Sequence, residues 1–225
     1  MPRVKVPRKG TNIDMTAMCD VAFLLLSFFI LCAKFKPAEA LAVVTPSSVA
    51  SKIAPDDNVV MITIDSAAKV YLSVSDKNVE QKQTMIDEIN TTKSLGLTDG
   101  EKANFVKQPA AYIGTPFSQL KSYLDRTPEQ LKGINLPGIP VKDSTDNELI
   151  TWMHAAATAF EGSKMNILVK GDNASLYPAF QGVIIAFKKN DQMKFQLVTD
   201  PVAPPHGSEL EKVLHSNTTG SKIVE

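Results

Sequence analysis

The sequence has no excess of charge of either sign. Its 225 residues include 24 Lys and Arg and 24 Asp and Glu, so the formal net charge at pH 7 is zero. Proteins that bind nucleic acid mainly through phosphate contacts are usually strongly basic, so we expect no nucleic-acid partner. With 44% hydrophobic and 21% charged residues, the composition is that of a chain that folds.

Long apolar runs are also few. The mean hydropathy is −0.05, whereas several spans of about 20 apolar residues each would raise it much further. This excludes a polytopic membrane protein and leaves room for one span at most.

Cysteine and histidine are scarce, with two and three residues. No two histidines have the spacing of metal ligands, and no nucleophile or phosphate-binding pattern stands out. His154, on a predicted helix, is better explained by packing or surface position than by catalysis. We therefore expect no enzyme, no metal site and no cofactor. The two cysteines, Cys19 and Cys32, are about 20 Å apart along one predicted helix, too far for a disulfide within the chain.

One apolar segment is present near the N-terminus. Residues 15–33 contain no Lys, Arg, Pro or Gly, and as a helix they would reach roughly 28 Å. The prediction is a single transmembrane helix at 14–34. Cations flank it on both sides, and the positive-inside rule places residues 1–13 in the cytoplasm and the rest of the chain outside. A cleaved signal peptide ending near Ala38-Glu39-Ala40 is the alternative, but Lys34 and Lys36 directly after the apolar run favour retention.

An acidic residue, Asp20, interrupts this apolar segment. A carboxylate inside a membrane is costly unless it is neutral or faces water or a partner. At 100° per residue, Thr16, Asp20 and Ser27 fall within about 40° of one another and form a polar stripe. Asp20 would be protonated when it faces lipid and ionised when it faces an aqueous path, which is the chemistry of a proton carrier lined by Thr16 and Ser27. An interfacial Asp at a frayed helix end is the alternative.

These residues resemble a known family. The run Ile13-Asp14-Met15-Thr16-Ala17-Met18-Cys19-Asp20-Val21, followed by AFLLLSFFIL, is similar to the signature of the ExbD/TolR biopolymer-transport proteins. The resemblance implies that Asp20 is the intramembrane acid needed for proton use and that Thr16 is its companion. It also likens ALAVVTP, with Leu41, Val43 and Pro46, to the short segment that the family places between helix and periplasmic domain, where a partner would bind.

The rest of the chain predicts a small α+β domain at 58–200, after a linker at 35–57. Alternating apolar residues predict a hairpin, and helical spacing after the pattern Thr145-Asp146-Asn147-Glu148 predicts a helix with a capping box. The expected order is ββαβαβ, with strands at 59–65, 69–74, 165–170 and 194–199 and helices at 146–161 and 179–189. Residues 167–199 resemble the C-terminal half of the ExbD periplasmic domain, which makes Asp172 and Tyr177 further candidates for partner binding.

Two segments do not fit the family pattern. About 70 residues, 75–144, form an insertion with helical periodicity at 79–92, 98–101 and 117–124, which we interpret as a folded surface excursion. The tail at 201–225 is polar and is expected to be flexible.

The functional expectation is a proton-channel or motor subunit of an inner-membrane complex, with its C-terminal domain in the periplasm. By resemblance, an ExbB-like ring surrounds it and a second copy pairs with it. A TonB-like protein transmits the resulting force to an outer-membrane transporter. Two alternatives stay open. One is a TolR-like subunit of a cell-envelope maintenance complex. The other is a membrane-anchored periplasmic binding or scaffold module with no proton role.

Overall fold

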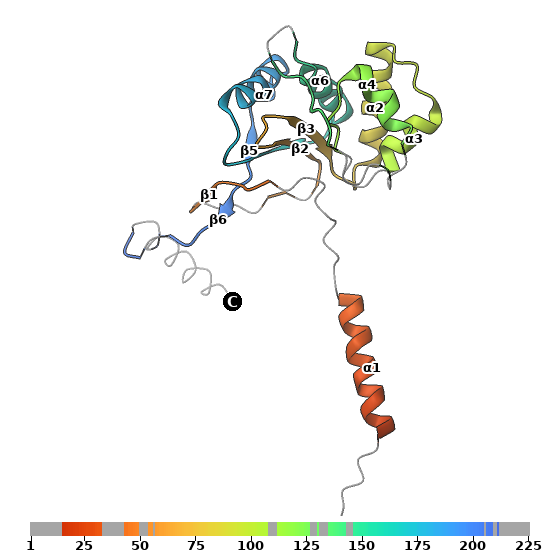
Figure 1. The fold of residues 1–225 in the computed structure, drawn as a ribbon, viewed down its shortest axis with the longest axis vertical. Coiled ribbons are helices and arrows are strands. Elements are labelled where there is room, and N and C mark those ends of the chain that lie inside the picture. The colour runs from red at the N-terminus through yellow and green to blue at the C-terminus, as the bar shows by residue number, and fades with distance from the viewer. Residues whose placement is uncertain are drawn as a thin grey trace, which may run out of the picture. The chain divides into compact units, whose positions relative to one another are not determined.

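The computed structural model describes residues 15–32, 43–49, 54–55, 57–107, 112–126, 130, 135–142, 146–204, 206–208 and 211. The chain divides into two compact units, Met1–Glu39 and Ala40–Glu225. We call them unit 1 and unit 2 and describe each by itself (Figure 1).

Unit 1 contains the helix α1, Met15–Cys32. Its large apolar side chains are exposed on every side, and Leu31 is 85% exposed. The predicted transmembrane span at 14–34 is not supported, because no helix among the described residues is both long and apolar enough to cross a membrane.

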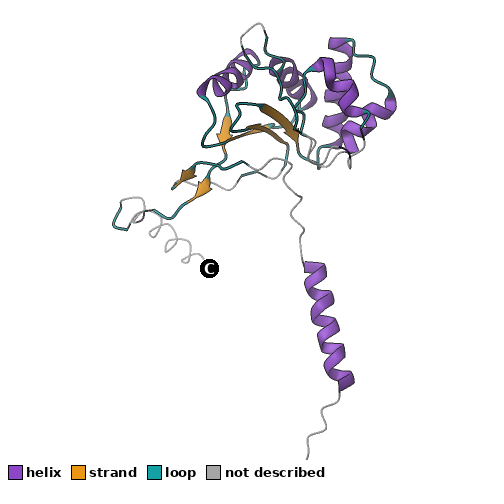
Figure 2. Cartoon of the chain, viewed as in Figure 1, coloured by secondary structure: helices purple, strands orange, loops and turns teal. Residues whose placement is uncertain are grey.

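Unit 2 is built on a four-stranded sheet, which confirms the α+β class (Figure 2). The strand order is β3-β2-β4-β5: β2 and β3 form an antiparallel hairpin, β4 is parallel to β2, and β5 is parallel to β4. The bounds are Val59–Ile64 for β2, Val70–Val74 for β3, Asn166–Gly171 for β4 and Phe195–Leu197 for β5. Each of these strands overlaps the segment in which alternation predicted it.

Two helices cover one face of the sheet, α6 (Leu149–Ala159) and α7 (Tyr177–Lys189) (Figure 1). The predicted start of α6 at 146 is wrong by three residues. Two residues of the expected capping pattern have distant partners instead: Asn147 Nδ2 donates to the Gly182 carbonyl (2.8 Å), and Glu148 Oε2 accepts from the Phe117 N–H (2.8 Å). Thr145, the expected cap, lies outside the described residues. The helix therefore begins at Leu149 without a side-chain cap.

The described residues of the insertion include the helices α2 (Val79–Lys93), α3 (Asp99–Lys107) and α4 (Phe117–Leu124). It is not the surface excursion expected from the sequence, because α2 packs on α6 and buries Met85, Ile86 and Ile89 completely. Its aromatic residues also enter the common core. Phe105 and Phe117 stack on Trp152 of α6, with ring centroids 6.2 and 5.4 Å away.

The insertion also covers one edge of the sheet. Leu72 in β3 exchanges backbone hydrogen bonds of 2.9 and 2.7 Å with Ile113, and the Ile139 N–H donates to the Val70 carbonyl at 2.8 Å. The opposite edge strand, β5, has β4 as its neighbour in the sheet.

A second, two-stranded sheet joins the linker to the start of the tail. The strand β1 (Ser47–Ser48) is parallel to β6 (Asp200–Pro201), and the Val202 N–H donates to the Ser48 carbonyl at 2.9 Å. This pairing was not predicted. The first residues of the tail, expected to be flexible, are therefore held by hydrogen bonds.

Candidate functional site

The polar stripe predicted on α1 falls on a continuous helix. Thr16, Asp20 and Ser27 all lie within Met15–Cys32, so the helical spacing places them on one side, within about 40° of one another. Asp20 is exposed and is the only acidic or basic residue in α1. An apolar helix with a single carboxyl group presents one site at which a proton can be held.

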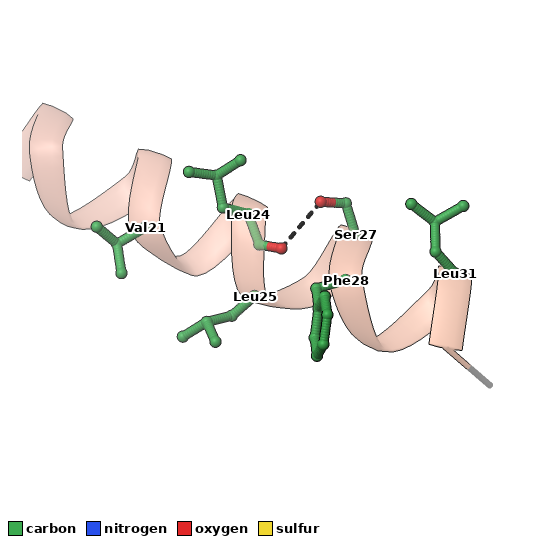
Figure 3. A pocket seen from close by; sticks show the side chains of 6 residues that line it. All are labelled: Val21, Leu24, Leu25, Ser27, Phe28 and Leu31. Carbon is green, nitrogen blue, oxygen red and sulfur yellow. Dashed lines mark hydrogen bonds between the residues drawn. The ribbon is translucent and has the colours of Figure 1, made fainter.

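The surface beside this stripe is apolar. A shallow groove of about 460 Å³ runs along α1 and is lined by Val21, Leu24, Leu25, Ser27, Phe28 and Leu31. The Ser27 hydroxyl donates to the Leu24 carbonyl at 2.9 Å, so the helix backbone satisfies it locally (Figure 3). A helix that is apolar all round is normally covered by other helices or by lipid. The exposed side chains of α1 therefore need a cover that the described residues of unit 1 do not supply.

A second cluster forms in unit 2, where the linker meets the loop after β4. Asp172 Oδ2 accepts from the Val44 N–H at 3.1 Å, and the Asn173 N–H donates to the Val44 carbonyl at 2.8 Å. The Pro46 carbonyl accepts from Asp200 at 3.0 Å. The structure thus joins Asp172 to Val44, which lies between the predicted partner-binding positions Val43 and Pro46 in the linker. Leu41 lies outside the described residues.

Tyr177 takes part in none of these hydrogen bonds. It is the first residue of α7, and its side chain is 72% exposed, next to Leu176 at 62%. The carboxyl ends of the parallel strands β4 and β5 carry further exposed apolar side chains that the sequence did not single out, including Leu197 in β5 and Val44 in the linker. The alternation of apolar and polar residues in β5 could have indicated Leu197 as a side chain on one face of the strand, but no local pattern indicates that Val44 is exposed.

Glu148 connects the insertion to the rest of unit 2, and two further buried charged groups are held within the insertion itself. Burial raises the pKa of Glu148, although its hydrogen bond from Phe117 and the nearby Lys93 partly oppose this shift. In α2, Lys82 is 2% exposed, and its ammonium group lies 2.8 Å from the Asp76 carboxylate. In α3, the pKa of Glu101 is lowered because its carboxylate accepts a hydrogen bond from the Thr98 backbone N–H. These arrangements hold structure together rather than form a reaction centre.

The described residues contain no group of three or more His, Cys, Asp and Glu side chains placed to hold a metal ion. What they do contain is a separate apolar helix with one carboxyl group, followed by an α+β domain whose linker is held against the sheet. Because the exposed apolar surface of α1 needs a cover, this organisation suits a subunit of a larger assembly.

The family model for the biopolymer transport protein ExbD/TolR matches residues 7–202, and the chain belongs to this family. Its members are non-enzymatic, transport-associated subunits that generally work in complexes with ExbB or TolQ and with TonB or TolA, and they are typically anchored in the inner membrane. Neither the curated proteins nor the solved structures include a significant match.

Proposed function

We propose that this chain is the ExbD-type subunit of an inner-membrane complex that uses the proton motive force to energise transport across the outer membrane. Asp20 carries the proton. An ExbB-like ring surrounds α1, the chain works as a pair, and the domain formed by residues 58–200 lies in the periplasm and passes force to a TonB-like protein.

The observation that supports this proposal best is the setting of Asp20. It is the single charged residue in a helix whose large apolar side chains are 54–85% exposed, so partner helices and lipid must cover α1 in the working complex. A carboxyl group in such a cover is neutral away from water and ionised at an aqueous path. Moving one charge across the membrane releases about 2.3 kcal/mol per 100 mV, comparable to the cost of exposing the carboxylate.

Membrane attachment belongs to the proposal and depends on the whole segment 14–34. The family is typically anchored in the inner membrane, and the flanking cations Lys34 and Lys36 suit the interface at the end of such a segment. Thr16 and Ser27 line the same side of α1 as Asp20 and provide the polar surroundings of its proton path.

We assign partner binding to the linker cluster. Val43 and Pro46 flank Val44, whose N–H donates to Asp172, and Leu41 precedes them in the sequence. Tyr177 adds an exposed aromatic ring at the start of α7, and such rings are enriched at protein interfaces. The TonB-like client would contact this cluster.

Substituting Asp20→Asn tests the proton role, because asparagine keeps the size of the side chain but cannot release a proton. We expect proton-dependent uptake to be abolished while expression and co-purification with the ExbB-like ring persist. The matched control is Asp14→Asn, the same chemical change six residues earlier, which should leave uptake normal.

Full uptake by the Asp20→Asn variant would refute the motor and leave a membrane-anchored scaffold as the function. The neighbouring open reading frames distinguish the remaining candidates. An adjacent ExbB-like protein and a TonB-like protein support the ExbD role, whereas TolQ-like and TolA-like neighbours would assign the chain to cell-envelope maintenance.

A further inference from the structure

One end of the sheet in unit 2 carries four exposed lysines, which we call the basic patch. Two of them close α7, one directly precedes β5, and one lies two residues before β4. Because Phe195 pairs with Ile167, the residues before β4 and β5 lie side by side. On the other side of β4, Val59 pairs with Asn166, so Asp57 lies near Lys164, but the Asp57 carboxylate is already paired with Lys77 at 2.9 Å. The backbone of the turn after α7 is tight, with the Gln192 N–H donating to the Phe187 carbonyl at 2.9 Å. The members of the basic patch are Lys164, Lys188, Lys189 and Lys194.

The charge of the patch is opposite to that of its domain. Residues 40–225 hold 18 basic and 21 acidic residues, whereas the patch has four cations against two acids that neighbour it in the sequence, Glu161 and Asp191. Within the described part of the chain, none of the four lysines forms an ion pair. Their charge is therefore available to a partner.

The helix dipole explains the position of only two of the four lysines. Lys188 and Lys189 occupy the last turn of α7, where cations favour the C-terminal end of a helix. Lys164 and Lys194 lie outside α7, so that account does not extend to them. Met193, next to Lys194 in the sequence, is 52% exposed, which places a flexible apolar side chain beside a cation of the patch.

We propose that the basic patch docks on anionic phospholipid headgroups of the membrane to which the chain is attached. Cations with an apolar side chain beside them suit the boundary between headgroups and acyl chains. Each lysine held at an anionic surface favours the docked state about fivefold. Because the chain is tethered, docking is intramolecular, and a contact too weak for free association suffices. This inference depends on the membrane attachment proposed above, which keeps a lipid surface within reach of the patch.

The experiment uses the full chain in lipid nanodiscs. Cys19 and Cys32 are replaced by serine, and an environment-sensitive dye is attached after Met193→Cys or, as the control site, after Val79→Cys. Val79 is 53% exposed at the start of α2. Quenching by acrylamide, a neutral molecule, is compared between phosphatidylcholine nanodiscs and nanodiscs that contain phosphatidylglycerol, at low and high salt.

We expect the dye at 193 to be protected only with phosphatidylglycerol and only at low salt, because the screening length falls from about 10 Å at 0.1 M to about 3 Å at 1 M. The dye at 79 should respond to neither change. The double substitution Lys189→Glu and Lys194→Glu should lower the docked-to-free ratio at least about 25-fold, since each lysine contributes about fivefold.

Equal quenching in the two lipids, or protection that survives the charge reversal, would overturn the proposal. So would protection that appears only when an acidic protein is added, because the partner would then be a protein. A chain that fails to stay with nanodiscs of either composition would instead refute membrane attachment, which separates this failure from that of lipid docking.

Discussion

The role of the insertion in the core leads to a quantitative prediction for Ile89→Ala. Ile89 is fully buried in α2, on the helix that packs against α6. The change removes three carbon atoms, and at about 0.8 kcal/mol for each buried methylene-sized group the transfer loss is about 2.5 kcal/mol. The cavity left behind raises the expected loss in unfolding free energy to about 3–4 kcal/mol.

Urea unfolding of the full chain in mild detergent measures this loss. Trp152 is the only tryptophan and lies between Phe105 of α3 and Phe117 of α4, so its fluorescence reports on the junction of insertion and core. With a slope of about 2 kcal/mol per M urea, the midpoint should fall by about 1.5–2 M. Far-UV circular dichroism should follow the same single transition.

The control is Val79→Ala in the same helix, where the side chain is 53% exposed and the free energy of unfolding should change by less than about 0.5 kcal/mol. If Ile89→Ala shifted the midpoint no more than Val79→Ala, the insertion would not belong to the core. The same conclusion would follow if helical signal were lost in an early separate transition while the Trp152 transition stayed in place.

Two further variants test unit 2. Asp172→Ala removes the acceptor for the Val44 N–H, so we expect the free energy of unfolding in urea to fall by about 1 kcal/mol and protease cleavage within 43–49 to become faster. Asp172→Asn should be intermediate in both measurements. Unchanged cleavage would show that Asp172 does not hold the linker. Because burial raises the pKa of Glu148, the ionised form costs stability above the folded-state pKa, and the cost is relieved as the pH falls through that value. Glu148→Gln should therefore exceed the wild type in urea midpoint near neutral pH and lose this advantage in acid, whereas the exposed control Glu161→Gln should show no such difference.

The sheet and its covering helix α7 could be predicted from the sequence because their signals are local. Alternation of Val60, Ile62 and Ile64 marks β2, and these side chains are 0–1% exposed in the structure. Pro178 at the start of α7 and Asn190 at its end mark the helix within two residues.

The start of α6 could not be predicted, because residues of the expected capping pattern have partners that only the tertiary structure supplies. Gly182, the acceptor for Asn147, is 35 residues away, and Phe117, the donor to Glu148, is 31 residues away. The burial of the insertion was missed for a similar reason. Periodicity located its helices but cannot say whether their apolar faces meet the core or a local cluster.

In the candidate site, too, the features that depend on local sequence could be predicted and those that depend on long-range contacts could not. The stripe of Thr16, Asp20 and Ser27 follows from helical geometry alone, and its proton role stays a prediction. The contact between Asp172 and Val44 joins residues 128 positions apart. The sequence could therefore indicate the linker and Asp172 as separate candidates but could not predict that they meet.

The covering of β3 by Ile113 and Ile139 limits how this sheet can grow. A sheet with two accessible edges can add strands at both and so extend without end, as fibres do. In the part of the chain that the structure describes, β3 is occupied by the chain itself and β5 is the other terminal strand of this sheet. If a second copy added its β5 there, the two sheets would meet edge to edge, and the occupied β3 strands would give the pair no further edge of this sheet from which to continue.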